Sequence, residues 1–127
     1  MTMAVDKYAK FTKPWRWSSQ PRPLSLWVKA PEEYGFYEIG YCERGTFVPK
    51  YGGRAAGTTL RRRLRKHHFS SHNPHIQAAR GRLWYRYKVF DSPAEARFVE
   101  ALQVIAFQEE YEWNDRQEWA QHWALER

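Results

Sequence analysis

Aromatic and β-branched side chains, punctuated by glycine, dominate residues 34–41, which predicts a β-strand. Arg44-Gly45 marks a turn, and residues 46–52 predict a second strand that forms a hairpin with the first. Pro49 has no N–H to donate, so it places the second strand at a sheet edge or at a bulge. The glycines that follow predict a mobile or tightly turned connection, made of Gly52, Gly53 and Gly57.

A helical period begins after this connection. Thr58 or Thr59 can cap the N-terminus of a helix that runs to about His68. Leu60 and Leu64 lie four residues apart, which places both on one face of that helix. The segment is therefore predicted to be an amphipathic helix packed on the hairpin.

The second half of the chain repeats both kinds of pattern. Residues 74–80 predict a short helix that ends at Gly81, and residues 83–90 alternate as a third strand does. The alternation puts one set of side chains on each face: Leu83, Tyr85, Tyr87 and Val89 against Trp84, Arg86 and Lys88. Ser92-Pro93-Ala94-Glu95 is a capping box, so another helix begins there and continues to about Phe107. Four of its apolar residues are spaced for burial: Phe98, Ala101, Leu102 and Ile105.

These elements predict one α+β (mixed α/β) domain with a small three-stranded, mainly antiparallel sheet flanked by helices. Residues 34–115 would form the core. Residues 1–33, broken up by prolines, would form an aromatic and basic N-terminal arm, for which covering the core is favoured over binding a nucleic-acid strand. Residues 116–127 would form a helical extension that packs on the core.

Composition narrows the class of protein. A chain of 127 residues with 43% hydrophobic side chains is large enough for one core and too apolar for wholesale disorder. Cys42 is the only cysteine, which excludes an internal disulfide, and no apolar run is long enough for a membrane span or a secretory signal. We therefore expect no membrane partner and an intracellular, cytoplasmic location.

Charge is distributed unevenly along the chain. The net charge is +7, and the stretch from Arg44 to Phe90 holds twelve Lys or Arg residues without one Asp or Glu. From Asp91 to the end, nine acids face three bases. An uninterrupted basic segment is typical of proteins that bind a polyanion, so nucleic acid is favoured over a merely solvated basic face.

Several candidate functional groups occur in a fixed order. Gly35-Phe36-Tyr37 lies in the first strand, and Tyr51-Gly52-Gly53 follows in the second. The basic helix contributes Arg61 to Leu64 and then His67. Glu100 is the only acid among residues 98–107, and Asn114 follows the helix.

This order resembles the GIY-YIG nuclease superfamily over residues 35 to about 115. The two tripeptides correspond to the motifs that name the family, with Phe and Gly at the middle positions where the family has Ile. The resemblance implies a catalytic arginine at Arg63, with Arg61 as the fallback, a His at the position of His67, a metal-binding carboxylate at Glu100 and a terminal Asn at Asn114. It also implies a bacterial or phage origin.

These residue types suit phosphodiester hydrolysis. Glu100 could hold one Mg²⁺, with Mn²⁺ as an alternative, because such ions keep several waters and complete their shell with substrate phosphate. Arg63 could clamp the phosphate, and either Tyr37 or Tyr51 could be the general base. His67 could orient the water, share the base role or bind phosphate. Seven cations and one amide are expected to contact nucleic acid: Arg54, Arg61, Arg62, Arg65, Lys66, Arg80, Arg82 and Asn114.

Other interpretations of single features stay open. Glu100 could pair with Arg97 or lie on an exposed stripe. His67, His68, His72 and His75 crowd together, but a zinc site there is disfavoured because Cys42 has no partner at the usual spacing.

We therefore predict a metal-dependent GIY-YIG endonuclease acting on DNA, with a homodimer or a partner protein possible. The main alternative is a nucleic-acid-binding module of the same fold without hydrolysis. A third is a structural subunit whose basic belt docks on an acidic protein.

Overall fold

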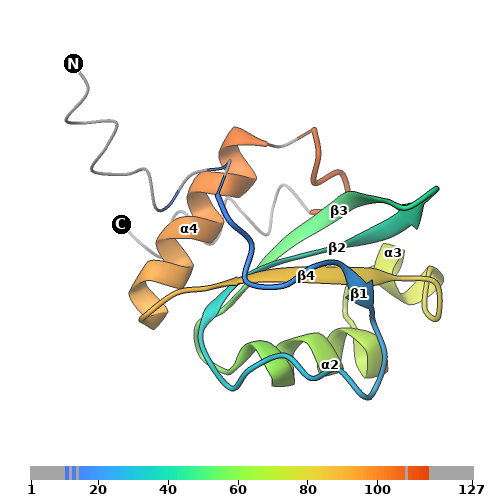
Figure 1. Ribbon diagram of the computed structural model, residues 1–127, viewed down its shortest axis with the longest axis horizontal. Coiled ribbons are helices and arrows are strands. Elements are labelled where there is room, and N and C mark those ends of the chain that lie inside the picture. The colour runs from blue at the N-terminus through green and yellow to red at the C-terminus, as the bar shows by residue number, and fades with distance from the viewer. Residues whose placement is uncertain (1–10, 12, 14, 108, 115–127) are drawn as a thin grey trace.

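A four-stranded antiparallel sheet forms the middle layer of the molecule, with helices on both of its faces (Figure 1). The computed structural model describes residues 11, 13, 15–107 and 109–114. The strands are β1 (Arg22–Pro23), β2 (Gly35–Glu43), β3 (Thr46–Ala55) and β4 (Trp84–Val89), in the spatial order β1-β4-β2-β3. The helices are α2 (Leu60–Ser70), α3 (Pro74–Ala78) and α4 (Pro93–Ala106). The predicted C-terminal extension, residues 116–127, lies outside the described residues.

The sheet has four strands, so the prediction of three was wrong. The additional strand, β1, is only two residues long and pairs with the outer edge of β4, where Arg22 lies opposite Tyr85. Pro21 before it and Pro23 within it argued against a strand, but an edge strand needs hydrogen bonds on one side only. The segment after it enters the core, where Leu24, Val28 and Ala30 are buried.

The hairpin of β2 and β3 confirms the interpretation of Pro49 and corrects that of the glycines. β3 is the outer strand, and its register with β2 shifts beside Gly40, which pairs with Pro49. Gly52 and Gly53 continue the strand instead of forming a connection. A Cβ on Gly53 would lie 2.4 Å from the Tyr37 hydroxyl, so this glycine is needed for a close approach across the strands.

The helix caps follow the sequence signals. Thr59 accepts a hydrogen bond from the N–H of Arg62, and Ser92 accepts one from Glu95. Asn73 caps α3, which ends at Ala78 and so is shorter than predicted. α2 and α4 run close to their predicted lengths.

The buried face of α4 differs from the prediction. The buried residues are Ala96, Val99, Gln103 and Val104, whereas Phe98 and Ile105 are 42% and 41% exposed. Because α4 carries apolar residues on more than one side, spacing alone did not determine which side meets the sheet.

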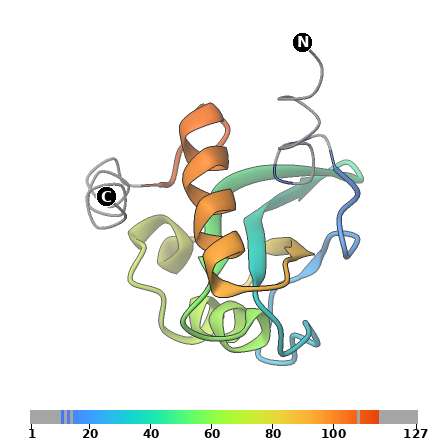
Figure 2. The same cartoon turned by 90° about the vertical axis from the view of Figure 1, so that its left-hand side faces the viewer.

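Two clusters of buried residues occupy the two faces of the sheet. One lies under α2 and α3 and includes Tyr37, Ile39, Tyr51, Leu60 and Leu64. The other lies under α4, is built around Phe36, Val99 and Tyr111, and is completed by Trp15 and Trp17. In the turned view of Figure 2, α4 stands in front of the strands and α2 lies below them. In the part of the chain that the structure describes, no helix has the length and apolar character needed to span a membrane.

Candidate functional site

Two tyrosines of the hairpin lie side by side on the face of the sheet that α2 covers. Tyr37 is opposite Gly53, and Tyr51 is opposite Ile39, so the two rings occupy adjacent rows of the same face. Their centroids are 6.3 Å apart, and both rings are almost fully buried. The missing side chain at Gly53 leaves room for the Tyr37 hydroxyl beside the edge strand.

α2 supplies an arginine and a histidine to this pair. Arg63 and His67 are four residues apart, so they project from the same side of the helix. Arg63 Nε donates to the Tyr37 hydroxyl at 3.2 Å, and the hydroxyl lies 2.6 Å from His67 Nε2. The His67 ring also stands edge-on to Tyr51, with centroids 5.3 Å apart. The four side chains therefore form one contiguous cluster.

Burial makes His67 a neutral hydrogen-bond acceptor. Burial, together with the charges of Arg63 and Lys66, lowers the pKa of His67 to about 3. His67 Nδ1 lies 3.0 Å from Ser71 Oγ, at the C-terminal cap of α2. In the neutral ring, Nδ1–H can donate to Ser71 while Nε2 accepts the Tyr37 proton. Sequence reasoning missed Ser71, whose only signal was its position four residues after His67.

The neighbours of Arg63 stabilise the positive charge of its guanidinium. The Tyr37 oxygen raises the pKa of the Arg63 guanidinium further above its usual value, and the Glu100 carboxylate acts in the same direction. A permanently charged guanidinium beside a phenol stabilises negative charge on that phenol. The cluster thus combines a proton acceptor, a hydroxyl and a cation within hydrogen-bonding distance.

Glu100 reaches this neighbourhood from α4, on the other side of edge strand β3. Its side chain is 14% exposed, and its Oε1 lies 3.4 Å from Arg54 Nη1. The partner is Arg54 of β3, whereas sequence reasoning had considered Arg97. Glu100 also contributes to the charge around Arg63. The structure therefore places Tyr37, Tyr51, Arg63 and His67 in one contact cluster, while Glu100 contacts Arg54 and acts on Arg63 only through its charge.

The remaining basic residues fall into two groups. The side chains of Arg62, Lys66, Arg80 and Arg82 are exposed and, among the described residues, donate no hydrogen bond to a backbone carbonyl. Arg61 Nε donates to the Ala30 carbonyl at 2.8 Å, and Arg65, although also exposed, donates twice to the Val28 carbonyl, at 3.2 and 3.0 Å. These two arginines anchor the loop before β2, a role that the basic composition of α2 did not reveal.

Asn114 makes paired hydrogen bonds to the backbone of β3. Its Oδ1 accepts from the Gly52 N–H and its Nδ2 donates to the Gly52 carbonyl, both at 2.9 Å. Trp113 N–H adds a bond to the Lys50 carbonyl at 2.9 Å. Residues 113–114 therefore tie the chain to the outer edge of the hairpin next to Tyr51.

The crowded histidines do not form a metal site in the described residues. No group of three or more His, Cys, Asp or Glu side chains that could hold an ion is found among them. His67 is engaged with Tyr37 and Ser71, and the His75 ring stacks on Trp113 at 5.8 Å. Glu100 is left as the candidate metal ligand among the predicted site residues.

A second buried carboxylate, missed by sequence reasoning, lies on the α4 face. Glu38 is fully buried, accepts from Arg86 at 2.7 Å and from Lys13 at 2.9 Å, and also accepts from the Tyr111 hydroxyl. Burial, together with the charge of Glu38, raises the pKa of Tyr111. The sequence signal was a single acid within an aromatic strand.

Comparison with known proteins finds one informative similarity. Neither a protein-family model nor a curated protein matches this chain. A solved structure does match: a Tyr-to-Phe point mutant of the GIY-YIG N-terminal endonuclease domain of UvrC from Thermotoga maritima, bound to its catalytic divalent cation. The TM-score is 0.51 at 27% identity, and the match covers 70% of this chain and 90% of that one. The chain therefore has a GIY-YIG-like fold, and the similarity supports a nuclease at the level of the family.

Proposed function

We propose that this protein is a metal-dependent endonuclease of the GIY-YIG type that hydrolyses phosphodiester bonds in DNA. The observation that carries the proposal is the hydrogen-bonded cluster of Tyr37, His67 and Arg63. A tyrosine that only packs in the core of a sheet does not need both a proton acceptor and a guanidinium at its hydroxyl. It is the arrangement expected for a phenol that gives up and regains a proton.

Tyr37 is the proposed general base. Its proton moves to His67 Nε2, and its oxygen takes a proton from the water that attacks phosphorus. Arg63 stabilises the charge on the phenol during this transfer. Water adds to phosphorus, the bond from phosphorus to the leaving sugar oxygen breaks, and that oxygen takes up a proton from solvent. The proton held at His67 then returns to solvent, which restores the neutral pair. Tyr51, whose ring lies against His67, remains the alternative base.

The surroundings of Glu100 fit a single divalent cation, Mg²⁺ or Mn²⁺. Its side chain is 14% exposed, and among the described residues no group of three or more His, Cys, Asp or Glu side chains offers a larger metal cage. Mg²⁺ suits such a site because it keeps several waters and needs only one or two protein carboxylates beside the substrate phosphate. When bound, the ion would supply Lewis-acid stabilisation of the phosphate. The divalent cation of the similar UvrC domain supports this assignment.

Electrostatics supports a nucleic-acid substrate. Arg62, Lys66, Arg80 and Arg82 are exposed on the segment that lacks acids. Contacts from such side chains to phosphates are independent of sequence and weaken as salt rises. Arg54, Arg61 and Arg65 would support the surface through the hydrogen bonds and ion pair described above.

Cleavage assays test the proposal directly. Labelled single-stranded DNA, double-stranded DNA and RNA would be incubated with Mg²⁺, Mn²⁺ or EDTA, comparing wild type with Glu100→Gln. We expect metal-dependent cutting of DNA that is lost in the variant and kept in Glu109→Gln, which changes an exposed acid. Binding of these substrates without any cutting in either metal would overturn the proposal in favour of a non-catalytic binding module.

A further inference from the structure

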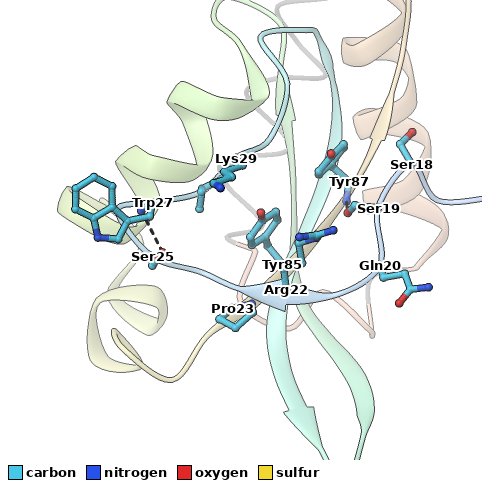
Figure 3. A pocket seen from close by; sticks show the side chains of 11 residues that line it. Ser18, Ser19, Gln20, Arg22, Pro23, Ser25, Trp27, Lys29, Tyr85 and Tyr87 are labelled. Atoms are coloured by element: carbon cyan, nitrogen blue, oxygen red, sulfur yellow. Dashed lines mark hydrogen bonds between the residues drawn. The ribbon is translucent and has the colours of Figure 1, made fainter.

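A pocket lies toward the opposite edge of the sheet from the catalytic cluster. This pocket of about 940 Å³ opens between residues 18–29, which include β1, and the neighbouring strand β4 (Figure 3). Its walls include Arg22 of β1, Lys29 of the following loop, and Tyr85 and Tyr87 of β4. Sequence reasoning had interpreted the arm as a cover for the core, which leaves this cavity without a role.

The lining of the pocket is cationic and aromatic. Arg22 and Lys29 are its charged residues, and no acid is among the described residues that line it. The rings of Tyr85 and Tyr87 are nearly parallel, 12° apart, with centroids separated by 6.3 Å. Serine and glutamine side chains supply further polar groups. This composition suits a ligand that carries both negative charge and flat rings.

Trp27 stands on the rim of the pocket and is 80% exposed. An indole so exposed gains little from packing, yet its backbone is well anchored. Trp27 N–H donates to Ser25 Oγ at 3.1 Å, and the next carbonyl, that of Val28, accepts both bonds from Arg65. The loop therefore presents the indole on a fixed backbone, as a stacking platform requires.

The pocket and the catalytic cluster are joined across α2. Tyr87 lies directly opposite Tyr37 in the sheet register. Arg61 and Arg65 reach the 28–30 loop from one flank of α2, and Arg63 and His67 reach Tyr37 from the other. Between the flanks, Arg62 and Lys66 point outward and are exposed. A cationic ridge thus leads from the catalytic edge of the sheet to the pocket.

We infer that this pocket binds an unpaired nucleotide strand of the substrate, with phosphate on Arg22 and Lys29 and a base stacked on Trp27. The inference rests on the proposed function, because it assigns to the same protein a preference for substrates with a single-stranded portion next to the scissile bond. An unpaired strand is favoured over a duplex because stacking on an exposed indole needs an accessible base face. Two cations in an acid-free lining disfavour a purely apolar partner.

Equilibrium binding in EDTA tests the inference without cleavage. Fluorescence anisotropy would compare a labelled single strand, the blunt duplex of the same sequence and that duplex with a single-stranded overhang. Trp27→Ala should weaken binding of the single strand and of the overhang duplex by roughly tenfold and leave the blunt duplex unchanged. Arg22→Gln with Lys29→Gln should lower the slope of log affinity against log salt by about 1.4 for the single strand.

Two control variants separate stacking from other effects. Leu26→Ala removes a neighbouring side chain, 44% exposed, from the same loop, and Arg97→Gln removes an exposed charge on α4. Both should bind like wild type. Equal losses for all three substrates, or equal losses in Leu26→Ala, would overturn the inference. A change of oligomeric state in Trp27→Ala with unchanged DNA binding would also overturn it, in favour of a protein contact.

The two proposals can fail separately. If wild type cuts DNA but Trp27→Ala binds and cuts overhang substrates normally, only the pocket inference fails. If wild type binds single strands through Trp27 but cuts nothing, the endonuclease proposal fails while the pocket keeps its ligand.

Discussion

The two faces of the sheet each bury a polar network, and the networks differ in kind. Under α2, the Tyr37 hydroxyl is hydrogen-bonded to His67 and to the Arg63 guanidinium, and no carboxylate takes part in these contacts. Under α4, the carboxylate of Glu38 is matched against Arg86 and Lys13. The first network lies beside edge strand β3, and in the second the fully buried Glu38 is covered by Lys13, Arg86 and the aromatic rings around them.

This difference assigns catalysis to the network under α2 and stability of the fold to the network under α4. A proton can be shared along the Tyr37–His67 pair because the hydroxyl lies 2.6 Å from Nε2 and the Arg63 guanidinium stabilises negative charge on the phenol. The Glu38 carboxylate instead accepts hydrogen bonds from two cations and a hydroxyl in a fully buried position, so these contacts hold the fold together. Changes under α2 should therefore lower activity more than stability, and changes under α4 should do the reverse.

Removing the Tyr37 hydroxyl should have the largest effect. Tyr37→Phe deletes the proposed base, which we expect to lower the cleavage rate by about 10²- to 10⁴-fold. It leaves His67 Nε2 without its partner, at about 1–3 kcal/mol of stability. Single-turnover cleavage and urea unfolding measure the two quantities. Tyr34→Phe, on a partly exposed tyrosine of the same hairpin, should change neither, and full activity of Tyr37→Phe would transfer the base role to Tyr51.

Neutralising Glu38 should lower stability strongly and activity little. Glu38→Gln keeps the shape of the side chain but leaves Lys13 and Arg86 without their counter-charge, which should cost about 3–5 kcal/mol in unfolding free energy. The matched variant Glu112→Gln breaks the surface ion pair with Lys50 and should cost at most about 1 kcal/mol. Below its melting temperature, folded Glu38→Gln should cut DNA at the wild-type rate. A large loss of cleavage in the folded variant would show that the Glu38 network also contributes to catalysis.

Adding one methyl group at Gly53 should lower cleavage by displacing Tyr37. In Gly53→Ala the new Cβ would meet the Tyr37 hydroxyl, 2.4 Å away, and displace a buried ring. Because a small displacement of a reacting group can cost two orders of magnitude in rate, this change should lower cleavage by about 10²-fold. Gly57→Ala is the control, since a Cβ there meets no atom within 4 Å. Equal activity of the two alanine variants would show that the position of Tyr37 is not critical.

Acidification should act on the α2 face through His67. Burial lowers the pKa of His67 to about 3, below the usual value of 6.5. The unfolded chain therefore binds one more proton between these values, so this contribution to stability is complete above pH 6.5 and is lost as pH falls toward 3. The slope should approach about 1.4 kcal/mol per pH unit.

Urea unfolding between pH 7 and pH 4 measures that slope. His67→Gln should flatten the pH dependence by the contribution of this one group. His68→Gln changes a less buried neighbour and should flatten it less. An unchanged slope in His67→Gln would mean that the buried histidine does not control the acid response.

Local signals in the chain predicted the strands and helices well. Thr59 and Ser92 cap their helices because a side-chain oxygen next to a helical run satisfies nearby N–H groups. The order of tyrosine, arginine and histidine predicted residues that the structure brings together. The resemblance to the GIY-YIG family supplied their roles, which composition and spacing alone did not.

Features that depend on distant partners were not predicted. β1 exists because Arg22 meets the free edge of β4, and the buried side of α4 was decided by the sheet that it covers. Ser71 acquires a role only through its contact with His67, and Arg65 only through the Val28 carbonyl.

The sequence by itself determined the hairpin, the helix caps, the acid-free basic segment and the identity of the candidate catalytic residues. These depend on periodicity, on hydrogen bonds between neighbours and on charge, all of which are local. Tertiary structure decided that Gly53 makes room for Tyr37, that Glu100 meets Arg54 across the edge of β3, and that Trp27 borders a cationic pocket. Each of these results from segments far apart in the chain packing together, which no local pattern encodes.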